Sequence, residues 1–323
     1  MSLLSLIFSL LLEQLRPVDP RGFPFGAFDR YADLIARNFN AGRRRHGLFG
    51  WVLAVLPWVI LADVVFVMLN NLSIVLGLAW SVGVLYVTMG LRQFSGGFTA
   101  VQEALREGRH DDARRLLREW KGEDTSEYTP QDMTKIAIEF GLASAHRHVF
   151  GVIAWYVFLP AVLGTILPGF LGALLCGPGG AVLYRLSSIV AVRWGQRHEE
   201  DFRVFGGMAR DVFAVLDWVP VRITALSFAI VGDFEDAVYC WRSQAAQWLD
   251  REMGVVLSSG AGALGVRLGE SLHRDGVLVF RPELGLGDEA DLEHLNSAVG
   301  LIWRTLVLWV LVIALMTVAS WVS

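Results

Sequence analysis

Long apolar stretches constrain the fold of this chain more than any other feature of its sequence. Three of them meet the length of about 20 mostly apolar residues that a membrane-spanning helix needs: residues 47–69, 71–91 and 298–322. The first two are separated only at Asn70 and Asn71, so we expect a tight antiparallel hairpin. A hydrophobic fraction of 54% exceeds the roughly 45–50% of soluble domains. The sequence therefore predicts an all-α, multi-pass helical integral membrane protein with about four to six membrane segments.

Three other apolar segments are marginal as spans. Residues 149–176 are too long for one ordinary span and contain Pro160 and Pro168, each of which is expected to kink or break a helix. With the short apolar run 181–194, they form either a span plus a re-entrant return or two short tilted helices. Residues 1–15 lack a basic segment and a cleavage site, so we expect a retained membrane segment rather than a cleaved signal peptide.

The arginine distribution predicts the orientation of the chain. Arginines at 37, 43–45 and 92 flank the hairpin on both ends, and basic loops face the cytoplasm. We therefore expect a bacterial inner-membrane protein whose large loops are cytoplasmic and whose first partner is the lipid bilayer. The net charge of −4 gives no reason to expect a nucleic-acid partner.

This orientation divides the chain into five regions. They are N-terminal membrane segments including the hairpin (1–91), a cytoplasmic amphipathic helical loop (92–147), membrane or re-entrant segments (148–195), a cytoplasmic or interfacial helical region (196–297) and a C-terminal transmembrane helix (298–323). In the first loop we expect two short helices with a break at Gly108, and Asp111 or Asp112 as cap of the second.

Residues 212–232 are apolar enough to suggest a span but contain Asp217, Pro220 and Arg222. Two unpaired charges near the bilayer centre would cost about 5–7 kcal/mol, and Pro220 would remove a helical hydrogen bond. We therefore predict that one helix ends near Leu216 and that Asp217 is the N-cap of a second.

In this interpretation Pro220 lies in the first turn of the second helix, where no hydrogen bond is lost. The helix is then a short interfacial one that ends at Gly232 as a left-handed terminal residue. Asp233 is expected to cap the helix that follows.

Few residues offer chemistry on their own. Asp63 is an intramembrane acid and thus a functional candidate, unless it pairs with a neighbouring helix. Cys176 and Cys240 form neither a disulfide framework nor a CxxC motif, so we expect both to be packing residues. The sequence predicts no metal site.

Several segments resemble known membrane proteins. "LDWVPVRITALSFAIVGDFEDAV" resembles AmpE, an inner-membrane protein linked to β-lactamase regulation, and its arginine-containing turn is similar to the CobD/CbiB family. "GAGALGVRLGESLHRDG" with "RPELG", and "GPGGAVLYRLSS", resemble CobD/CbiB more closely. The resemblance covers residues 135–286.

The CobD/CbiB enzymes are adenosylcobinamide-phosphate synthases of cobalamin biosynthesis, and the resemblance implies four ligand-binding candidates: Glu139, Arg185, Arg222 and Arg267. The sequence also departs from the family. In a polar run that begins at Glu139, Ala143, Ser144 and Arg147 replace an acid, an amide and a second acid. After "YR", Ser188 and Ala191 stand where the family has asparagine and aspartate.

Two hypotheses follow. In the first, the protein belongs to this superfamily, has lost ligase chemistry and has an AmpE-like regulatory or ligand-sensing role, with an anionic ligand that is a corrinoid or bears phosphate. Its protein partner is not identified. In the alternative, it is an adenosylcobinamide-phosphate synthase that joins aminopropanol phosphate to adenosylcobyric acid. ATP and magnesium are required only in that alternative.

Overall fold

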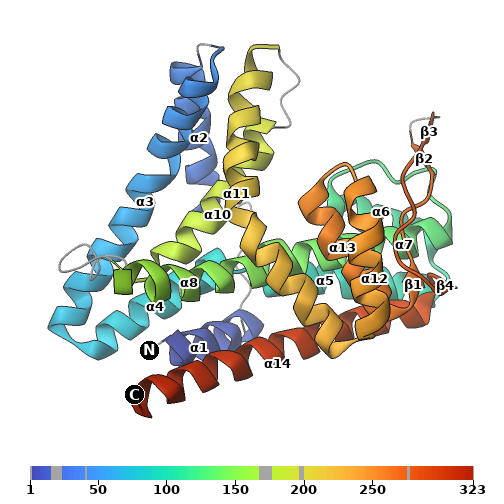
Figure 1. Ribbon diagram of the computed structural model, residues 1–323. Helices are drawn as coiled ribbons and strands as arrows, with labels where there is room; N and C mark the ends of the chain where they lie inside the picture. Colours follow the sequence, from blue (N-terminus) through green and yellow to red (C-terminus); the bar gives the residue numbers. More distant parts are fainter. Residues whose placement is uncertain are drawn as a thin grey trace. The chain divides into compact units, whose positions relative to one another are not determined.

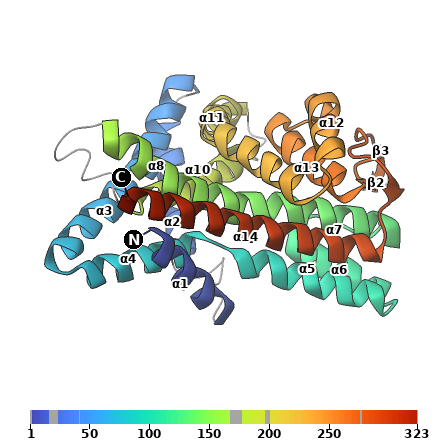
Figure 2. The ribbon, with the colours of Figure 1, turned by 60° about the horizontal axis from the view of Figure 1, so that its bottom comes forward.

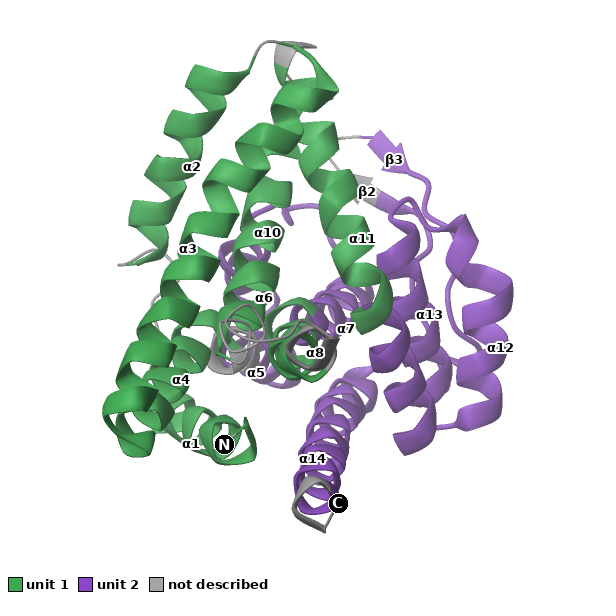
Figure 3. Ribbon diagram, turned by 60° about the vertical axis from the view of Figure 1, so that its left-hand side comes forward, with its two compact units in different colours: residues 1–91, 147–220 green, residues 92–146, 221–323 purple. Residues whose placement is uncertain are grey.

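The computed structural model describes residues 2–15, 24–40, 42–166, 177–195, 200–274 and 277–322. Helices make up most of this part of the chain (Figure 1). The chain divides into two compact units (Figure 3), of which unit 1 comprises Met1–Leu91 and Arg147–Pro220 and unit 2 comprises Arg92–His146 and Val221–Ser323. The expected all-α, membrane-type fold is confirmed.

Unit 1 is built around a buried central helix. This helix, α10, has nearly every side chain buried and packs on α3 and α8. The run 181–194 is therefore part of a 17-residue core helix. The helices of unit 1 are α1 (Ser2–Leu15), α2 (Phe25–Phe39), α3 (Arg44–Leu72), α4 (Ile74–Thr88), the π-helical turn η1 (His146–Phe150, from residue 147), α8 (Gly151–Ile166), α10 (Gly179–Gly195) and α11 (Glu200–Val231) as far as Pro220.

The expected hairpin is formed by α3 and α4, which pack together. Its turn lies at Ser73, whose hydroxyl accepts the Val75 N–H at 3.3 Å, and not at Asn70 and Asn71, which belong to α3. Trp80 of α4 donates its indole N–H to the carbonyl of Ala62 at 2.9 Å. The second arm is only 15 residues long, shorter than the stretch 71–91 suggested.

Prolines lie inside α3, α8 and α11 without ending any of these helices. Pro160 therefore does not break α8, and Pro168 lies outside the described residues. A proline at position i leaves the carbonyl of residue i−4 without its helical donor. In α3 the carbonyl that Pro57 leaves open belongs to Leu53, and it accepts the Tyr31 hydroxyl at 2.9 Å. In α11 the carbonyl that Pro220 leaves open belongs to Leu216, and it accepts the Trp155 indole N–H at 2.9 Å.

The predicted helix boundary at Leu216 is therefore wrong. The helix α11 is continuous over 32 residues, and a distant indole binds the carbonyl that Pro220 leaves without a donor. Asp217 is consequently not an N-cap, and within the described residues 200–231 there is one helix and not two. Gly232 does not adopt the left-handed conformation either; it lies where an added Cβ would overlap Ala263.

Unit 2 packs α14 along α7 and α13 (Figure 2). Its elements are α5 (Leu91–Arg106), α6 (His110–Lys121), α7 (Pro130–Ala145), α11 after Pro220, α12 (Phe234–Gln244), η2 (Ala245–Gln247), α13 (Arg251–Leu264), α14 (Leu292–Val322) and the strands β1 (Val266–Arg267), β2 (Leu272–Arg274), β3 (Val277–Val279) and β4 (Asp288–Glu289). The strands were not predicted; β1 pairs parallel with β4, and β2 pairs antiparallel with β3.

The amphipathic loop has the expected break at Gly108, whose φ is +71°. The cap prediction for the second helix is wrong, because Arg109 is its N-cap residue and makes no side-chain cap. Asp111 and Asp112 instead pair with arginines one turn away: Asp111 with Arg114 at 2.7 Å and Asp112 with Arg109 at 2.9 Å.

Three helices of the described chain are long and apolar enough to cross a membrane, by length and composition. They are Arg44–Leu72, Phe202–Val231 and Leu292–Ala319. The second includes residues 212–231, nearly all of the window that the sequence had disfavoured as a span. Helices α1 and α4 are apolar but shorter.

Candidate functional site

One face of α7 carries three polar residues at a spacing of four: Gln131, Lys135 and Glu139. This spacing puts them on the same side of a helix. All three bind the segment between α13 and α14: Gln131 donates to Glu289 at 2.5 Å, Lys135 forms an ion pair with Glu270, and Glu139 accepts the Gly269 N–H at 2.9 Å. The face of α7 therefore fixes a loop that is distant in sequence.

Arg281 completes the attachment of this loop. Its guanidinium binds the Glu139 carboxylate through two bonds, of 2.6 and 3.0 Å. It also donates to the carbonyls of Gly269 at 2.9 Å and Glu270 at 3.2 Å, and it lies 5.4 Å from the centre of the Trp248 ring. Both oxygens of the buried Glu139 carboxylate are thus engaged. We call Glu139, Gly269 and Arg281 the loop clamp.

The clamped loop has unusual backbone geometry at two successive residues. Gly269 has a φ of +80°, and Glu270 has a φ of +66°, which a residue with a side chain rarely adopts. Such a conformation costs on the order of 1–3 kcal/mol. The ion pair of Glu270 with buried Lys135 and the bonds of Arg281 hold the loop in this form.

Arg267 lies at the edge of the same loop, on β1. Its terminal nitrogens are 4.0 Å from Glu283 and 3.7 Å from Glu289, longer than hydrogen bonds. Its Nε is buried and has no hydrogen-bond partner among the described residues. The side chain is 36% exposed, so Arg267 is a half-exposed cation held only loosely by exposed acids.

Arg222 lies elsewhere in unit 2. It donates to Glu252 of α13 at 2.9 Å. In the described chain Glu139, Arg222 and Arg267 each pair with different partners, so the structure does not gather the three into one cluster. Asp233 accepts the Asp236 N–H at 3.0 Å and is the N-cap residue of α12.

Unit 1 contains a second, buried group of polar side chains. Tyr184 of α10 donates its hydroxyl to Asp217 of α11 at 2.7 Å, and both are buried. Arg185 follows on α10; it lies 5.3 Å from the centre of the Phe25 ring and near enough to Glu13 to interact with its charge. The Arg185 Nε has no hydrogen-bond partner among the described residues.

His148 belongs to this group and was not among the four candidates from the sequence. It lies in the π-helical turn η1, near Arg185 and Arg147. Its Nδ1 is buried without a hydrogen-bond partner in the described chain. Insertion of a π turn changes which side chains share a helix face, and no sequence periodicity announces it.

Asp63 of α3 binds the N-terminus of α10. One of its carboxylate oxygens accepts the Gly179 N–H at 2.7 Å, where a negative charge is favoured by the helix dipole. Any Cβ at Gly177 or Gly179 would overlap the carboxylate. The acid of α3 thus pairs with the neighbouring helix.

Within the residues that the structure describes, no group of three histidine, cysteine or acidic side chains is placed to hold a metal ion. The Glu139 carboxylate, the one acid kept from the family's polar run, is saturated by Arg281 and Gly269. These residues do not fit a magnesium site.

Most of the chain matches a known protein family. The model of the family described as CobD/Cbib protein matches residues 6–302. The chain belongs to the CobD/CbiB family.

Curated relatives agree with this membership. A protein of Stutzerimonas stutzeri named "Cobalamin biosynthesis protein CobD" is 35% identical over 318 residues, which is 96% of each chain. A protein of the same name from Chromobacterium violaceum is 30% identical and covers 95% of this chain and 94% of its own. One from Leptospira interrogans is 23% identical over 83% of this chain and 82% of its own. No solved structure matches.

Several contacts in both units join segments that resemble the CobD/CbiB family. In unit 2 the loop clamp joins Glu139 to the "GALGVRLG" and "RPELG" segments. In unit 1 Tyr184 and Asp217 join the "LYR" and "DWVPVR" segments. Arg281 and Tyr184 therefore connect segments that resemble the family, although neither was among the four candidates. The relatives' names support the biosynthetic alternative better than an AmpE-like regulatory role.

Proposed function

We propose that this protein is an adenosylcobinamide-phosphate synthase, which joins aminopropanol phosphate to adenosylcobyric acid through an ATP-dependent amide bond. The observation that carries the proposal is the match to the CobD/CbiB family over residues 6–302. Relatives named for cobalamin biosynthesis that align over 94–96% of their own length support it. We further propose that the protein resides in the bacterial inner membrane with its large loops in the cytoplasm.

We assign Arg267 to the phosphate of the substrate. It is half exposed, its contacts to Glu283 and Glu289 are loose, and its Nε has no hydrogen-bond partner among the described residues. Arginine presents a planar set of donors that matches a phosphate. If Arg267 exchanged its long contacts with the two carboxylates for a phosphate, it would lose little and would gain charge-assisted hydrogen bonds.

The loop clamp has a positioning role in this proposal. Glu139 and Arg281 hold each other's charges, so neither is assigned to ATP or to the substrates. They fix the backbone of Gly269 and Glu270 two and three residues after Arg267. The described residues do not supply a magnesium site, and we assign none.

The direct test is turnover. Purified protein in detergent is incubated with adenosylcobyric acid, ATP, magnesium and aminopropanol phosphate, and the product is identified by liquid chromatography and mass spectrometry. We expect adenosylcobinamide phosphate to form only with ATP. Folded protein that gives no ATP-dependent product would overturn the proposal. If that protein nevertheless binds the corrinoid substrate, the result supports the regulatory alternative. The departures from the family at Ala143, Ser144 and Arg147 would then account for the lost ligase activity.

A matched pair of variants tests the role of Arg267. Arg267→Met should raise the KM for aminopropanol phosphate while leaving the KM for ATP unchanged. Arg115→Met is the control, because Arg115 is an exposed arginine of the same unit that also pairs with acids. Equal KM values for the two variants would remove Arg267 from the site.

A further inference from the structure

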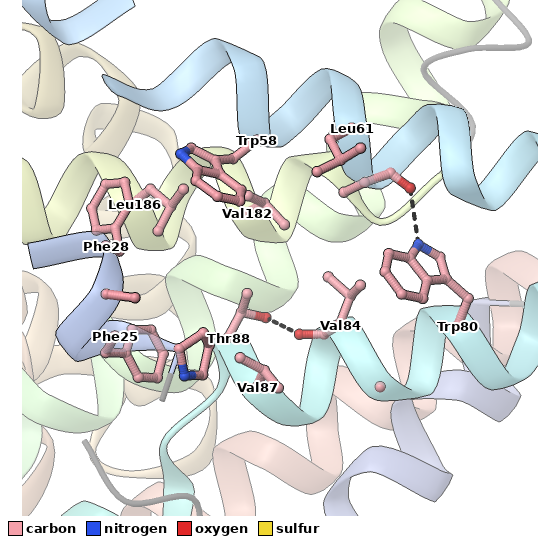
Figure 4. A pocket seen from close by; sticks show the side chains of 14 residues that line it. Phe25, Phe28, Trp58, Leu61, Trp80, Val84, Val87, Thr88, Val182 and Leu186 are labelled. Carbon is pink, nitrogen blue, oxygen red and sulfur yellow. Dashed lines mark hydrogen bonds between the residues drawn. The ribbon is translucent and has the colours of Figure 1, made fainter. Parts of the chain in front are cut away.

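Unit 1 contains an apolar pocket that the proposed reaction does not use (Figure 4). Its cavity volume is ≈ 400 Å³, and it is walled by α2, α3, α4 and α10. This volume lies within the roughly 300–1,000 Å³ of small-molecule sites. No residue that lines it in the described structure carries a charge.

The polar atoms of two lining residues are already engaged. Trp80 donates its indole N–H to the carbonyl of Ala62 at 2.9 Å, and Thr88 donates its hydroxyl to the carbonyl of Val84 at 2.8 Å. Figure 4 shows both bonds along the wall. A polar ligand would lose its bonds to water here and regain few, so the pocket selects an apolar occupant.

The pocket reaches a surface that hydrocarbon would touch. Trp58 and Leu61 line it and are also 40% and 51% exposed. Both lie on α3, a helix long and apolar enough to cross a membrane. Hydrocarbon chains of the bilayer are the apolar molecules present at such a surface.

Gly83 is a position in the pocket wall at which a larger side chain can be introduced. It lines the pocket from the middle of α4. Its φ is not left-handed, and an added Cβ would meet no atom within 4 Å. Neither backbone conformation nor close packing requires glycine here, so a substitution at this position changes the pocket and not the helix.

We propose that this pocket binds an acyl chain of a membrane phospholipid, which enters between α3 and α4 beside Trp58 and Leu61. The site is separate from the proposed ligase function. Its occupant is held by van der Waals packing against the pocket wall, because an acyl chain in the bilayer is already out of water.

The test uses the full-length protein in vesicles of phosphatidylethanolamine and phosphatidylglycerol that contain a phospholipid with a diazirine in the middle of one acyl chain. After irradiation, the labelled peptides are mapped by mass spectrometry. We expect labels on α3 near Trp58 and on α4 near Val87. A phospholipid with the diazirine in its headgroup should not label these positions.

Two variants fill the pocket and one serves as control. Gly83→Phe and Val87→Trp should each abolish the label near Trp58. Gly300→Phe should not, because Gly300 is also a helical glycine with open space around it, on α14. Size-exclusion chromatography in detergent establishes which variants fold, and either filling variant alone suffices. Undiminished labelling in a folded filling variant would show that lipid only coats the surface. Cross-links from these positions to a second copy of the chain would identify protein as the occupant, and would also overturn the proposal.

Discussion

Trp155 donates its indole N–H to the carbonyl oxygen of Leu216 at 2.9 Å. That carbonyl is the one which Pro220 leaves without a donor inside α11. Tyr31 does the same for the carbonyl of Leu53, below Pro57 of α3. At two of the prolines inside helices of unit 1, an aromatic side chain from another helix therefore replaces the missing backbone donor.

The first prediction is a coupling between Trp155 and Pro220. Trp155→Phe should destabilise the protein, because a half-buried carbonyl left without a partner costs about 1 kcal/mol or more. In a Pro220→Ala background the backbone regains an N–H at that position, so the same substitution should cost about 1 kcal/mol less. Unfolding free energies of the four proteins in detergent give the coupling. Equal costs in both backgrounds would show that the indole acts only through packing.

Tyr31 allows a cleaner version of this experiment. Tyr31→Phe removes only the hydroxyl that binds Leu53. We expect a loss of about 0.5–1.5 kcal/mol with Pro57 present and a smaller loss in the Pro57→Ala background. Thermal unfolding in detergent provides the measurement. If Tyr31→Phe causes the same loss of stability after Pro57 is replaced, the hydroxyl stabilises the protein independently of the proline.

The loop clamp predicts an asymmetry between single and double substitutions. Glu139→Leu leaves the Arg281 guanidinium, whose side chain is 17% exposed, without its carboxylate, and loss of one partner of a buried pair costs about 3–5 kcal/mol. Combining it with Arg281→Met removes the stranded charge and should recover much of that loss. Unfolding free energies decide the matter, and a double variant as unstable as the sum of the singles would contradict the model of a coupled pair.

The buried thiol of Cys240 predicts a loss of stability at alkaline pH. Burial, reinforced by the charge of Asp236, raises the pKa of this thiol from 9.0 to about 11. A group whose pKa is raised in the folded state contributes fully below its unfolded pKa, and the contribution is lost as the pH rises toward the folded pKa. We therefore expect stability to fall between about pH 9 and 11 by roughly 2–3 kcal/mol more than in Cys240→Ala. Parallel pH profiles for the two proteins would contradict this assignment.

The sequence predicted those parts of the fold that depend on local composition. The apolar stretches 47–69 and 298–322 correspond to α3 and α14, and the expected break at Gly108 is present. Asp233 and its helix depend on neighbouring residues only. In each case the determining residues lie within one or two turns of each other.

What the sequence could not predict depends on contacts between distant residues. Trp155 is 61 residues from Leu216, so the continuity of α11 cannot be read from the residues around Pro220. The loop clamp joins residues 142 apart. The strands are two or three residues long, too short for an alternating pattern to register.

The family resemblance supplied part of the site but not its chemistry. It drew attention to Glu139 and Arg267, which the structure places on either side of one loop. It did not single out Arg281, although the segment "RPELG" was among those quoted. A carboxylate fixed by a distant guanidinium and one that binds a substrate look the same in a sequence.

The loop clamp also has a consequence for how the protein is made. Arg281 leaves the ribosome 142 residues after Glu139, and at about 5–20 residues per second that delay is roughly 7–28 s. Throughout this interval the carboxylate on α7 has no guanidinium, and burying it alone would be costly. We therefore expect the surface of α7 that carries Glu139 to stay hydrated until Arg281 has been made. We expect the loop clamp to form late during synthesis, so that a chain interrupted before Arg281 would leave that surface exposed to water.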